Sequence, residues 1–371
     1  MKLTVLQSNF AKALNQVSRI VGSRTTLPVL GNVLIIAEKG KIKLSATDLE
    51  VAVTSLALGK IEEDGQLTVP ARLLSDFITN DNDESITFET KSDAVNVLHL
   101  KSEHYKATIT GISAEEFPTI PLLTSENVIK IANEDFSDAI KKVIIAPAND
   151  ETRPVLAGIY FQFNGKSLTL AATDSFRLAE KKLQFKEDAG EQKFIVPART
   201  MTEVLRLMST LEPEKAVEIS STENQIAFKI GDTEVVSRLI EGAFPNYSQI
   251  IPTSSKIKVS MNHSDFVSAV KMSALFAKNA ANNIRINIKK DEVSISSMAS
   301  PTGEAVSKIS AETSGGELSI AFNARYVLDI LAVNDGKKVI LELNDDATAG
   351  LIKSENDKDY IYIIMPLKLD S

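Results

Sequence analysis

The sequence contains no cysteine, so it can form no disulfide, no thiolate metal site and no cysteine nucleophile. It also has no apolar run that approaches the roughly 18 residues of a membrane-spanning helix. The first residues, Met1–Asn9, lack the apolar core of a secretory signal peptide, and we therefore expect a cytoplasmic protein. A hydrophobic content of 43% and a charged content of 24% are ordinary for a globular chain, and 371 residues allow two or three domains.

The common catalytic motifs are absent as well. The sequence has no GxxxxGK[ST] or GxGxxG phosphate loop, no HExxH zinc motif and no GxSxG nucleophile elbow. Its histidines, His99, His104 and His263, are scattered, and we interpret the first two as surface residues. Ser268–Lys271 fits the SxxK pattern, but so does Ser255–Lys258, so that pattern is not specific. We predict no catalytic residue, no metal site and no cofactor. A hydrolase stays an alternative, but it would need titratable groups that meet in a pocket, and the sequence alone does not show such a meeting.

One short pattern, Phe-x-x-Ala-aliphatic, occurs three times at nearly constant intervals, beginning at Phe10, Phe136 and Phe266. Each copy spaces its apolar residues by three and four, as on one face of a helix. The small alanine between larger residues would let such a helix lie close to a sheet. These segments are therefore predicted to be the first helices of three similar domains.

Three further markers follow these helices in the same order. Thr-Asp occurs at 47–48 and 173–174, and Val-Pro-Ala-Arg occurs at 69–72 and 196–199, with Phe-Asn-Ala-Arg at 322–325. Phe-Pro occurs at 117–118 and 244–245, and Met365-Pro366 is interpreted as its counterpart in the third copy. Chance similarity of amphipathic segments does not explain a shared order. We predict three domains, at 1–124, 125–253 and 254–371.

Each repeat contains two helical segments and about eight short strand-like runs. Runs of strands that are segregated from helices are typical of an α+β fold, with helices on one face of an antiparallel sheet. We expect an antiparallel sheet outside and two helices inside in each domain. The three domains would then form half of a ring, which a second copy closes head to tail.

The net charge of −8 at first argues against a nucleic-acid partner. The predicted helices, however, carry a small excess of positive charge, so the acidic residues lie mainly elsewhere. A ring with this distribution could hold DNA by non-specific phosphate contacts that permit sliding. The alternative is that these cations belong to ordinary solvated helix faces. The predicted DNA contacts are Lys12, Arg19, Arg24, Arg72, Lys141, Lys142, Arg199, Arg206 and Lys271.

Several longer motifs make the chain resemble a known family. The specific ones are 1–5 (MKLTV), 26–32 (TLPVLGN), 46–50 (ATDLE), Thr173-Asp174, Arg177-Leu178, Phe244-Pro245, Phe322-Asn323, 326–329 (YVLD) and 365–369 (MPLKL). Together they cover the whole chain. On these residues the sequence is similar to the bacterial DNA polymerase III β subunits, the sliding clamps.

The resemblance implies a head-to-tail homodimer of six domains that encircles double-stranded DNA without sequence preference. An ATP-driven clamp loader would place this ring on DNA, where it makes the replicative polymerase processive and catalyses nothing itself. The implied partners are the DNA polymerase III α subunit, the clamp loader and other proteins with a clamp-binding motif. A scaffold that binds these peptides but never touches DNA stays open as an alternative.

The resemblance also implies a peptide-binding pocket between the second and third domains. Leu, Met and Pro would give it an apolar surface, and a few polar groups would fix a bound backbone. Its residues would be Arg153, Leu156, Thr173, Ser175, Phe176, Arg177, Leu178, Pro245, Gln249, Ile250, Asn323, Tyr326, Ile364, Met365, Pro366 and Leu367. The implied dimer contact joins Ala107 and Ile109 of the first domain to Leu275 and Phe276 of the third.

The sequence departs from the family pattern in a few places. Family members often carry His or Gly where this chain has Ser175-Phe176, and a basic residue where it has Gln249. The residue before Arg199, often basic in relatives, is Ala198, and the chain continues past the usual end with Asp370-Ser371. We therefore expect a bulkier pocket with altered motif preference and a weaker hold on DNA.

Overall fold

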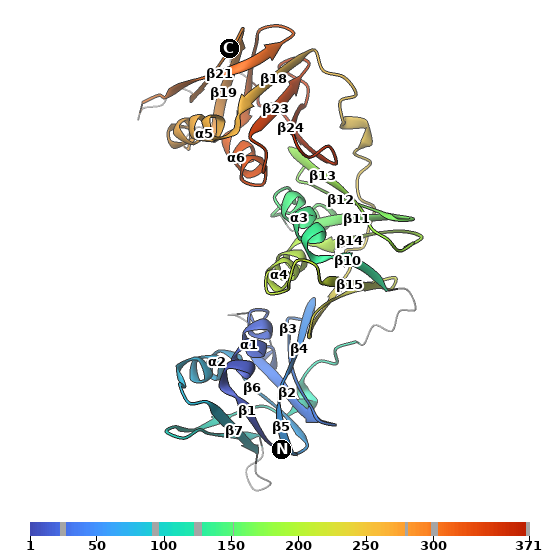
Figure 1. Ribbon diagram of the computed structural model, residues 1–371, viewed down its shortest axis with the longest axis vertical. Helices are drawn as coiled ribbons and strands as arrows, with labels where there is room; N and C mark the ends of the chain where they lie inside the picture. Colours follow the sequence, from blue (N-terminus) through green and yellow to red (C-terminus); the bar gives the residue numbers. More distant parts are fainter. Residues whose placement is uncertain are drawn as a thin grey trace. The chain divides into compact units, whose positions relative to one another are not determined.

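The computed structural model describes residues 1–22, 27–90, 96–121, 128–150, 152–278, 281–297 and 303–368. Within these ranges the chain forms six α-helices and 25 strands, and every strand pair between named strands is antiparallel (Figure 1). The predicted α+β class is confirmed. The elements occur as three successive repeats, each with two helices.

The first repeat contains one strand more than the other two. Its elements are β1 (Lys2–Leu6), α1 (Gln7–Ser18), β2 (Asn32–Glu38), β3 (Lys41–Thr47), β4 (Val51–Ala57), β5 (Gly59–Glu63), β6 (Gly65–Pro70), α2 (Ala71–Asn80), β7 (Ser85–Thr90), β8 (Val97–Lys101) and β9 (Lys106–Thr110). Short 3-10 turns at Pro28–Gly31 and Ala114–Glu116 flank these strands.

The second and third repeats follow the same order without a separate strand in the place of β5. The second contains β10 (Ile129–Ala132), α3 (Asn133–Val143), β11 (Gly158–Asn164), β12 (Ser167–Thr173), β13 (Arg177–Gln184), β14 (Glu191–Pro197), α4 (Ala198–Met208), β15 (Ala216–Ser221), β16 (Gln225–Ile230) and β17 (Thr233–Arg238). The third contains β18 (Ile257–Asn262), α5 (His263–Ala277), β19 (Asn283–Lys289), β20 (Glu292–Ser297), β21 (Val306–Ser314), β22 (Leu318–Asn323), α6 (Ala324–Ala332), β23 (Lys338–Leu343), β24 (Gly350–Ser354) and β25 (Tyr360–Ile364). Further 3-10 turns lie at Pro154–Leu156 and Ser248–Ile250.

The recurring phenylalanines occupy the core, as predicted. Phe10 and Phe136 are 0% exposed and Phe266 is 1% exposed, and the alanine three residues after each is also buried. The small alanine side chain lets the helix backbone approach the sheet closely. In the third repeat, α5 packs on β18–β21 and lies beside α6 (Figure 1).

The second helix of each repeat begins at the Pro-Ala-Arg or Asn-Ala-Arg motif. β6 ends at Pro70, which is the N-cap of α2, and β14 ends at Pro197 just before α4. Proline has no N–H to lose at a position where helical N–H groups lack partners. In the third repeat Asn323 replaces proline, and its side chain accepts the Arg325 N–H as a cap.

The chain divides into two compact units. The first comprises 1–133 and 203–239 and contains a five-stranded sheet, β5-β1-β7-β8-β9, and an eight-stranded sheet, β10-β15-β16-β17-β4-β3-β2-β6. The second comprises 134–202 and 240–371 and contains a twelve-stranded sheet, β14-β11-β12-β13-β25-β24-β23-β18-β21-β20-β19-β22. Each unit thus includes part of the middle repeat, and the boundaries 1–124, 125–253 and 254–371 stay a prediction.

Each unit contains one strand pair that links two repeats, which we call a joint. In the first joint, β4 pairs with β17 from Val51 opposite Ser237 to Ser55 opposite Thr233. In the second, β13 pairs with β25, from Arg177 opposite Ile364 to Lys181 opposite Tyr360. In both joints, the strand that follows the Thr-Asp motif pairs with the last strand of the next repeat.

The repeated Thr-Asp motif forms the turn that starts each joint. The Asp48 Oδ1 accepts the N–H of Glu50 at 3.1 Å and of Val51 at 2.9 Å. The Asp174 carboxylate accepts the equivalent two N–H groups at 2.9 and 3.0 Å. This side-chain turn fixes where the joint strand begins.

The joint register corrects one predicted correspondence. Ile364 occupies in the second joint the place that Ser237 occupies in the first, so Met365 corresponds to Arg238. The Met365 N–H donates to the Phe176 carbonyl at 2.8 Å, and the Arg238 N–H donates to the Glu50 carbonyl at 3.0 Å. Met365-Pro366 is therefore not the counterpart of Phe244-Pro245, because Phe244 lies six residues after Arg238.

In each of the first two repeats, the first helix contacts its joint through one equivalent position. In α3 this position is Lys142, which is 7% exposed and bonds Asp138 Oδ2 at 2.8 Å and Asp357 Oδ2 at 2.7 Å. Burial disfavours ionised Asp357, but bonds from Lys142 and Lys181 outweigh burial and lower the Asp357 pKa. Lys142 is thus a structural cation of the second joint, and its prediction as a DNA contact is wrong.

We expect Lys142→Met to lower the free energy of unfolding of the second unit by about 3 kcal/mol, since it leaves a buried carboxylate with one partner fewer. Urea unfolding followed by circular dichroism measures this effect. The difference from the unsubstituted chain should shrink as pH falls below the ordinary aspartate pKa of 3.8, where the unfolded chain begins to bind protons. Lys141→Met, at the neighbouring exposed residue, is the control; equal destabilisation in both variants would contradict the assignment.

Candidate functional site

Most of the predicted pocket residues converge at the second joint. Arg177 and Leu178 begin β13, and they lie opposite Ile364 and Ile363 of β25. Beyond β25, the Leu367 N–H donates to the Ala321 carbonyl at 2.9 Å, which ties the end of the chain to β22. The structure therefore brings residues from three distant segments together. Asp370 and Ser371 lie outside the described residues.

Arg177 organises the side of the site that faces α6. Its guanidinium is 7% exposed, bonds Asp174 Oδ2 at 3.0 Å and also pairs with Asp329. The guanidinium carbon lies 4.3 Å from the centre of the Tyr326 ring, a cation–π arrangement. Burial acts against the charged form, but Tyr362 and the two carboxylates outweigh it, and the pKa of Arg177 is raised. Arg177 is consequently a fixed charge that holds α6 against β13.

Sequence reasoning missed Asp174 and Asp329 as members of this site. Both lie in motifs that carry the family resemblance, so the residues were visible but their pairing was not. The Arg177–Asp329 contact spans 152 residues of sequence, and nothing in local periodicity predicts it. Tyr362 was also missed; its hydroxyl donates to the Tyr326 carbonyl at 3.0 Å.

The Ser175-Phe176 turn forms an exposed edge of the site. Ser175 has a φ of 80°, an unusual value for a residue with a side chain. Its N–H donates to Thr173 Oγ1 at 3.1 Å, and its hydroxyl accepts Arg153 Nη1 at 3.0 Å. The Phe176 side chain is 54% exposed, so it presents an aromatic surface next to this turn.

The linker after the second repeat crosses the outer face of β13. Tyr247 and Ile251 pack on a small core of Leu178, Leu351 and Ile363. The Tyr247 hydroxyl donates to the Glu180 carboxylate at 2.7 Å. Burial raises the pKa of Tyr247, and the Glu180 carboxylate raises it further. The linker is thereby fastened beside the site.

A hollow of about 510 Å³ lies under this linker, on the face of β11–β13 that points away from α3. Phe244 stacks on Tyr160 with ring centres 5.0 Å apart at its edge. In the first repeat, Phe117 instead packs with Leu34 in an apolar cluster that Ile120 covers. The middle repeat therefore leaves open a space that the first repeat fills.

Exposure divides the predicted pocket residues into three groups. The exposed residues are Arg153, Ser175, Phe176, Pro245, Gln249, Ile250 and Met365. The half-buried residues are Asn323, Tyr326, Pro366 and Leu367, and the buried ones are Leu156, Thr173, Arg177, Leu178 and Ile364. The buried group forms a floor and presents little surface to a ligand.

Most of the predicted DNA contacts are exposed, with two exceptions besides Arg24, which lies outside the described residues. Lys12, Arg19, Arg72, Lys141, Arg199 and Lys271 are exposed. Lys142 belongs to the second joint. Arg206 is held by the Glu203 carboxylate, and its Nη2 donates to the Gln16 carbonyl at 2.8 Å. Arg206 therefore stabilises the first unit, and its role as a DNA contact stays a prediction.

The predicted dimer contacts differ in what they expose. Ile109 in β9 is 3% exposed, because its side chain packs inside its own repeat. Leu275 and Met272 of α5 are 60% and 52% exposed, and Val306 of β21, a strand on which α5 packs, is 61% exposed. The third repeat thus carries an exposed apolar patch, whereas Ile109 would reach a partner mainly through its backbone.

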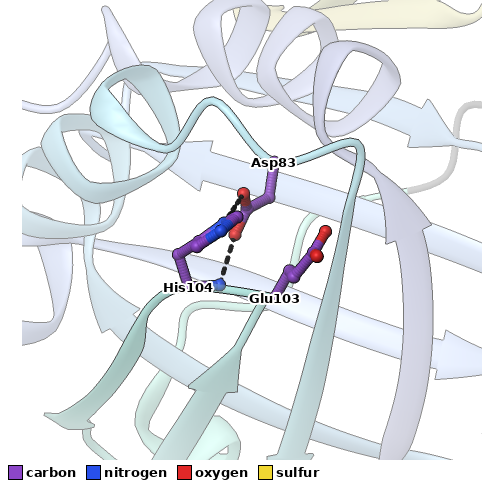
Figure 2. Close-up of side chains that lie close together, drawn as sticks. All are labelled: Asp83, Glu103 and His104. Atoms are coloured by element: carbon purple, nitrogen blue, oxygen red, sulfur yellow. Dashed lines mark hydrogen bonds and ion pairs between the residues drawn. The ribbon is translucent and has the colours of Figure 1, made fainter.

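One group of side chains has the composition of a metal site. Asp83, Glu103 and His104 place one ligand atom each within 4.8 Å of one another (Figure 2). His104 occupies both Asp83 oxygens, however, through its ring Nδ1 at 2.7 Å and its backbone N–H at 2.8 Å. These bonds lower the Asp83 pKa to about 2 and raise that of His104. We interpret the group as an ion pair that fastens the β8–β9 turn.

The two predicted surface histidines differ in exposure. The His104 side chain is 67% exposed, as expected. His99 is half-buried, its Nδ1 lies 3.3 Å from Thr108 Oγ1, and its Nε2 is buried without a partner. His99 is therefore only partly a surface residue.

Comparison with known proteins agrees with this geometry. Family models of the DNA polymerase III β subunit match residues 1–121 (N-terminal domain), 130–246 (central domain) and 248–368 (C-terminal domain). A β sliding clamp from Synechococcus elongatus is 30% identical over 378 residues, which cover 100% of both chains. One from Staphylococcus epidermidis is 26% identical over 99% of both chains.

Solved structures agree with the sequence comparisons. The DNA polymerase III β subunit of Pseudomonas aeruginosa has 28% identity and a TM-score of 0.94, with 100% of both chains covered. The DNA polymerase sliding clamp of Bacillus subtilis has 26% identity and the same TM-score and coverage. The fold and the joints therefore define a three-domain DNA clamp. The chain belongs to the DNA polymerase III β subunit family, the β sliding clamps.

Family membership makes the chain a processivity factor of a DNA polymerase that has no catalytic activity of its own. It connects the chain to DNA replication, with DNA and the polymerase as partners. None of the described helices is long and apolar enough to cross a membrane.

Proposed function

We propose that two copies of the chain form a closed head-to-tail ring around duplex DNA in the cytoplasm and tether the replicative polymerase to it. One observation carries the proposal. The third repeat presents the strand edge and helix position that form a joint in the first two repeats, and no described residue of the same chain covers them.

The strands support this closure. The joint strand of the first repeat, β4, pairs with β17, and that of the second, β13, pairs with β25. By the order of elements, the joint strand of the third repeat is β21, and the remaining last strand is β9. In the described part of the chain, β9 pairs only with β8, and residues 306–310 of β21 pair only with β20, whereas residues 311–314 pair with β18. Pairing β21 with β9 of the partner subunit would satisfy two exposed edges at once.

The first helices support the same conclusion. The joint position is Gln16 in α1, whose amide oxygen accepts the Ser55 hydroxyl at 2.7 Å and the Thr233 hydroxyl at 2.8 Å. In α3 it is Lys142, buried in its ion pairs. In α5 it is Met272, which is 52% exposed. An apolar residue at an unfilled joint position is suited to a contact with a second chain.

The registers of the two joints give an expected register for the third. Lys181 and Ser55 lie opposite Tyr360 and Thr233, the first residues of their partner strands. Ser307 of β21 takes the same place in the β20–β21 hairpin that Lys181 takes in the β12–β13 hairpin. We therefore expect Ser307 to lie opposite Lys106 of the partner subunit, the first residue of β9. Val306 would then lie opposite Ala107 of the partner subunit, in agreement with the predicted dimer contact.

We expect Leu275→Asp to convert the dimer into folded monomers, because it places a charge in the apolar patch of α5. Leu275 is 60% exposed, so the change should leave the fold of the chain intact. Native mass spectrometry measures the oligomeric state, and circular dichroism measures folding. Leu58→Asp, at a residue that is 75% exposed, is the matched control and should stay dimeric. A dimer that survives Leu275→Asp at micromolar concentration would exclude this interface.

The second part of the proposal is that exposed helix cations contact DNA phosphates. Lys12→Gln, Arg72→Gln and Lys271→Gln together should weaken retention on nicked circular duplex. The log–log slope of retention against salt should become flatter by about 0.9 for each phosphate that the variant no longer neutralises. Retention after loading by the clamp loader, measured over a salt series, tests this. Cutting the circular DNA with a nuclease should release the unsubstituted protein and the variant alike, because a closed ring can leave DNA only over an end.

The matched control neutralises three exposed lysines on strands and turns, Lys39→Gln, Lys229→Gln and Lys308→Gln, with side chains 85%, 60% and 66% exposed. This variant should retain the original salt slope. Equally fast release from circular and linear DNA would refute encirclement. Unchanged polymerase processivity after the helix substitutions would instead favour a scaffold that does not contact DNA.

The third part of the proposal is that the exposed residues around the second joint bind a short peptide of the polymerase, the clamp loader and other clamp-binding proteins. Phe176, Ile250 and Met365 offer apolar side chains that are 54%, 49% and 38% exposed. Arg153 and Gln249 add polar groups at the rim. An apolar surface with a few polar groups is the usual form of such a site.

Ile250→Ala combined with Met365→Ala should weaken binding of a fluorescent peptide from the polymerase α subunit by about 30-fold, as expected when central apolar side chains are truncated. Fluorescence anisotropy measures the affinity. Leu178 is unsuited to this test because it is 0% exposed, so its truncation would damage the core. Leu27→Ala with Leu58→Ala, two exposed residues elsewhere, is the control. Undiminished affinity in the first variant would remove the site.

A further inference from the structure

A cavity of about 290 Å³ lies beside the first joint. Its walls come from the turn that precedes β4, from the linker segment Pro118–Pro121 and from the end of β17. All of these residues belong to the first compact unit. The cavity uses none of the residues predicted for the peptide pocket, so it requires its own explanation.

The turn beside this cavity has the same construction as the turn beside the second joint. The Thr47 hydroxyl donates to the Val51 carbonyl at 2.9 Å, and the Thr173 hydroxyl donates to the Arg177 carbonyl at 2.6 Å. Leu49 and its counterpart, the exposed pocket residue Ser175, have φ values of 79° and 80°. The two turns therefore project their side chains from the same backbone geometry.

The other walls correspond as well. Arg238 stands where Met365 stands, as their hydrogen bonds to Glu50 and Phe176 show. Pro118 stands where Pro245 stands, because each follows the phenylalanine of a Phe-Pro pair. The cavity is thus the counterpart, one repeat earlier, of the proposed peptide site.

The chemistry of the two places differs. The cavity has the side chain of Leu49, 48% exposed, where the second joint has a serine. It has the exposed Arg238 in place of an exposed methionine, and Glu50 in place of Phe176. Among residues with described positions, the Arg238 guanidinium has no carboxylate within ion-pair distance. A cation beside an apolar surface suits a ligand that combines an aliphatic group with a carboxylate.

We propose that this cavity is a second docking site, which takes an extended peptide of a partner protein. An aliphatic side chain of the peptide would pack on Leu49 and Ile120, and an adjacent Asp or Glu would pair with Arg238. Glu50 would disfavour a second acidic residue on the opposite side. This inference goes beyond the proposed function, since it adds a site with a different ligand preference.

The absence of cysteine permits a clean test, because one introduced thiol can carry an environment-sensitive dye. Thr119→Cys places the dye at the cavity, on an exposed linker residue. The probes are two acetylated eight-residue peptides that differ only in a central Leu-Asp-Leu or Leu-Lys-Leu. The first should give a saturable signal, and the second should bind at least about tenfold more weakly, as expected for a charge-assisted contact.

Arg238→Glu should reverse this order of preference, and Leu49→Ala should weaken both peptides. Asn246→Cys, the counterpart of Thr119 beside the second joint, reports on the proposed peptide site separately and should be unaffected by Arg238→Glu. No saturable signal at Thr119→Cys, or equal binding of both peptides there, would overturn the second site whatever the dye at residue 246 reports. A signal at residue 246 alone would leave the clamp proposal standing and remove only this inference.

Discussion

The antiparallel pairing of a joint strand with the last strand of the following repeat is the constraint on which the structure depends. A strand edge that lacks a partner exposes backbone donors and acceptors, so each joint satisfies a whole row of them. The chain has three joint strands and supplies internal partners for two, and the proposed second copy would supply the third partner.

The two internal joints share a backbone and differ in their side chains. In the first, Gln16 and the hydroxyls of Ser55 and Thr233 make neutral hydrogen bonds. In the second, buried charges replace them, with Lys142 beside Asp357 and Arg177 between two aspartates. Removing one partner of a buried ion pair lowers the free energy of unfolding strongly, so single substitutions should destabilise the second joint more than the first. Repetition thus preserved the geometry and left the chemistry of each joint free to diverge.

The sequence predicted the parts of the fold that local patterns determine. The phenylalanine helices lie where expected, because the spacing of their apolar residues specifies them. The Thr-Asp pairs were expected only as markers of the repeats, and the structure shows that they form turns. The register of β25 was beyond such patterns, and Met365-Pro366 was placed wrongly for that reason. Local patterns could not show that the fold engages Lys142 and Arg206, because their partners, Asp357 and Gln16, are remote in sequence. The same remoteness hid the pairing of Asp329 with Arg177.

The division of the middle repeat between two compact units has a consequence for biosynthesis. The first unit needs β17, so β4 must wait through the synthesis of about one and a half repeats before the Thr233 hydroxyl can reach Ser55, 178 positions away. Contacts of such long range form slowly, and the waiting edge is open to wrong partners in the meantime. A ribosome that is still making the second repeat would therefore carry a half-finished sheet, and chaperones that shield nascent strands would be most useful in that interval.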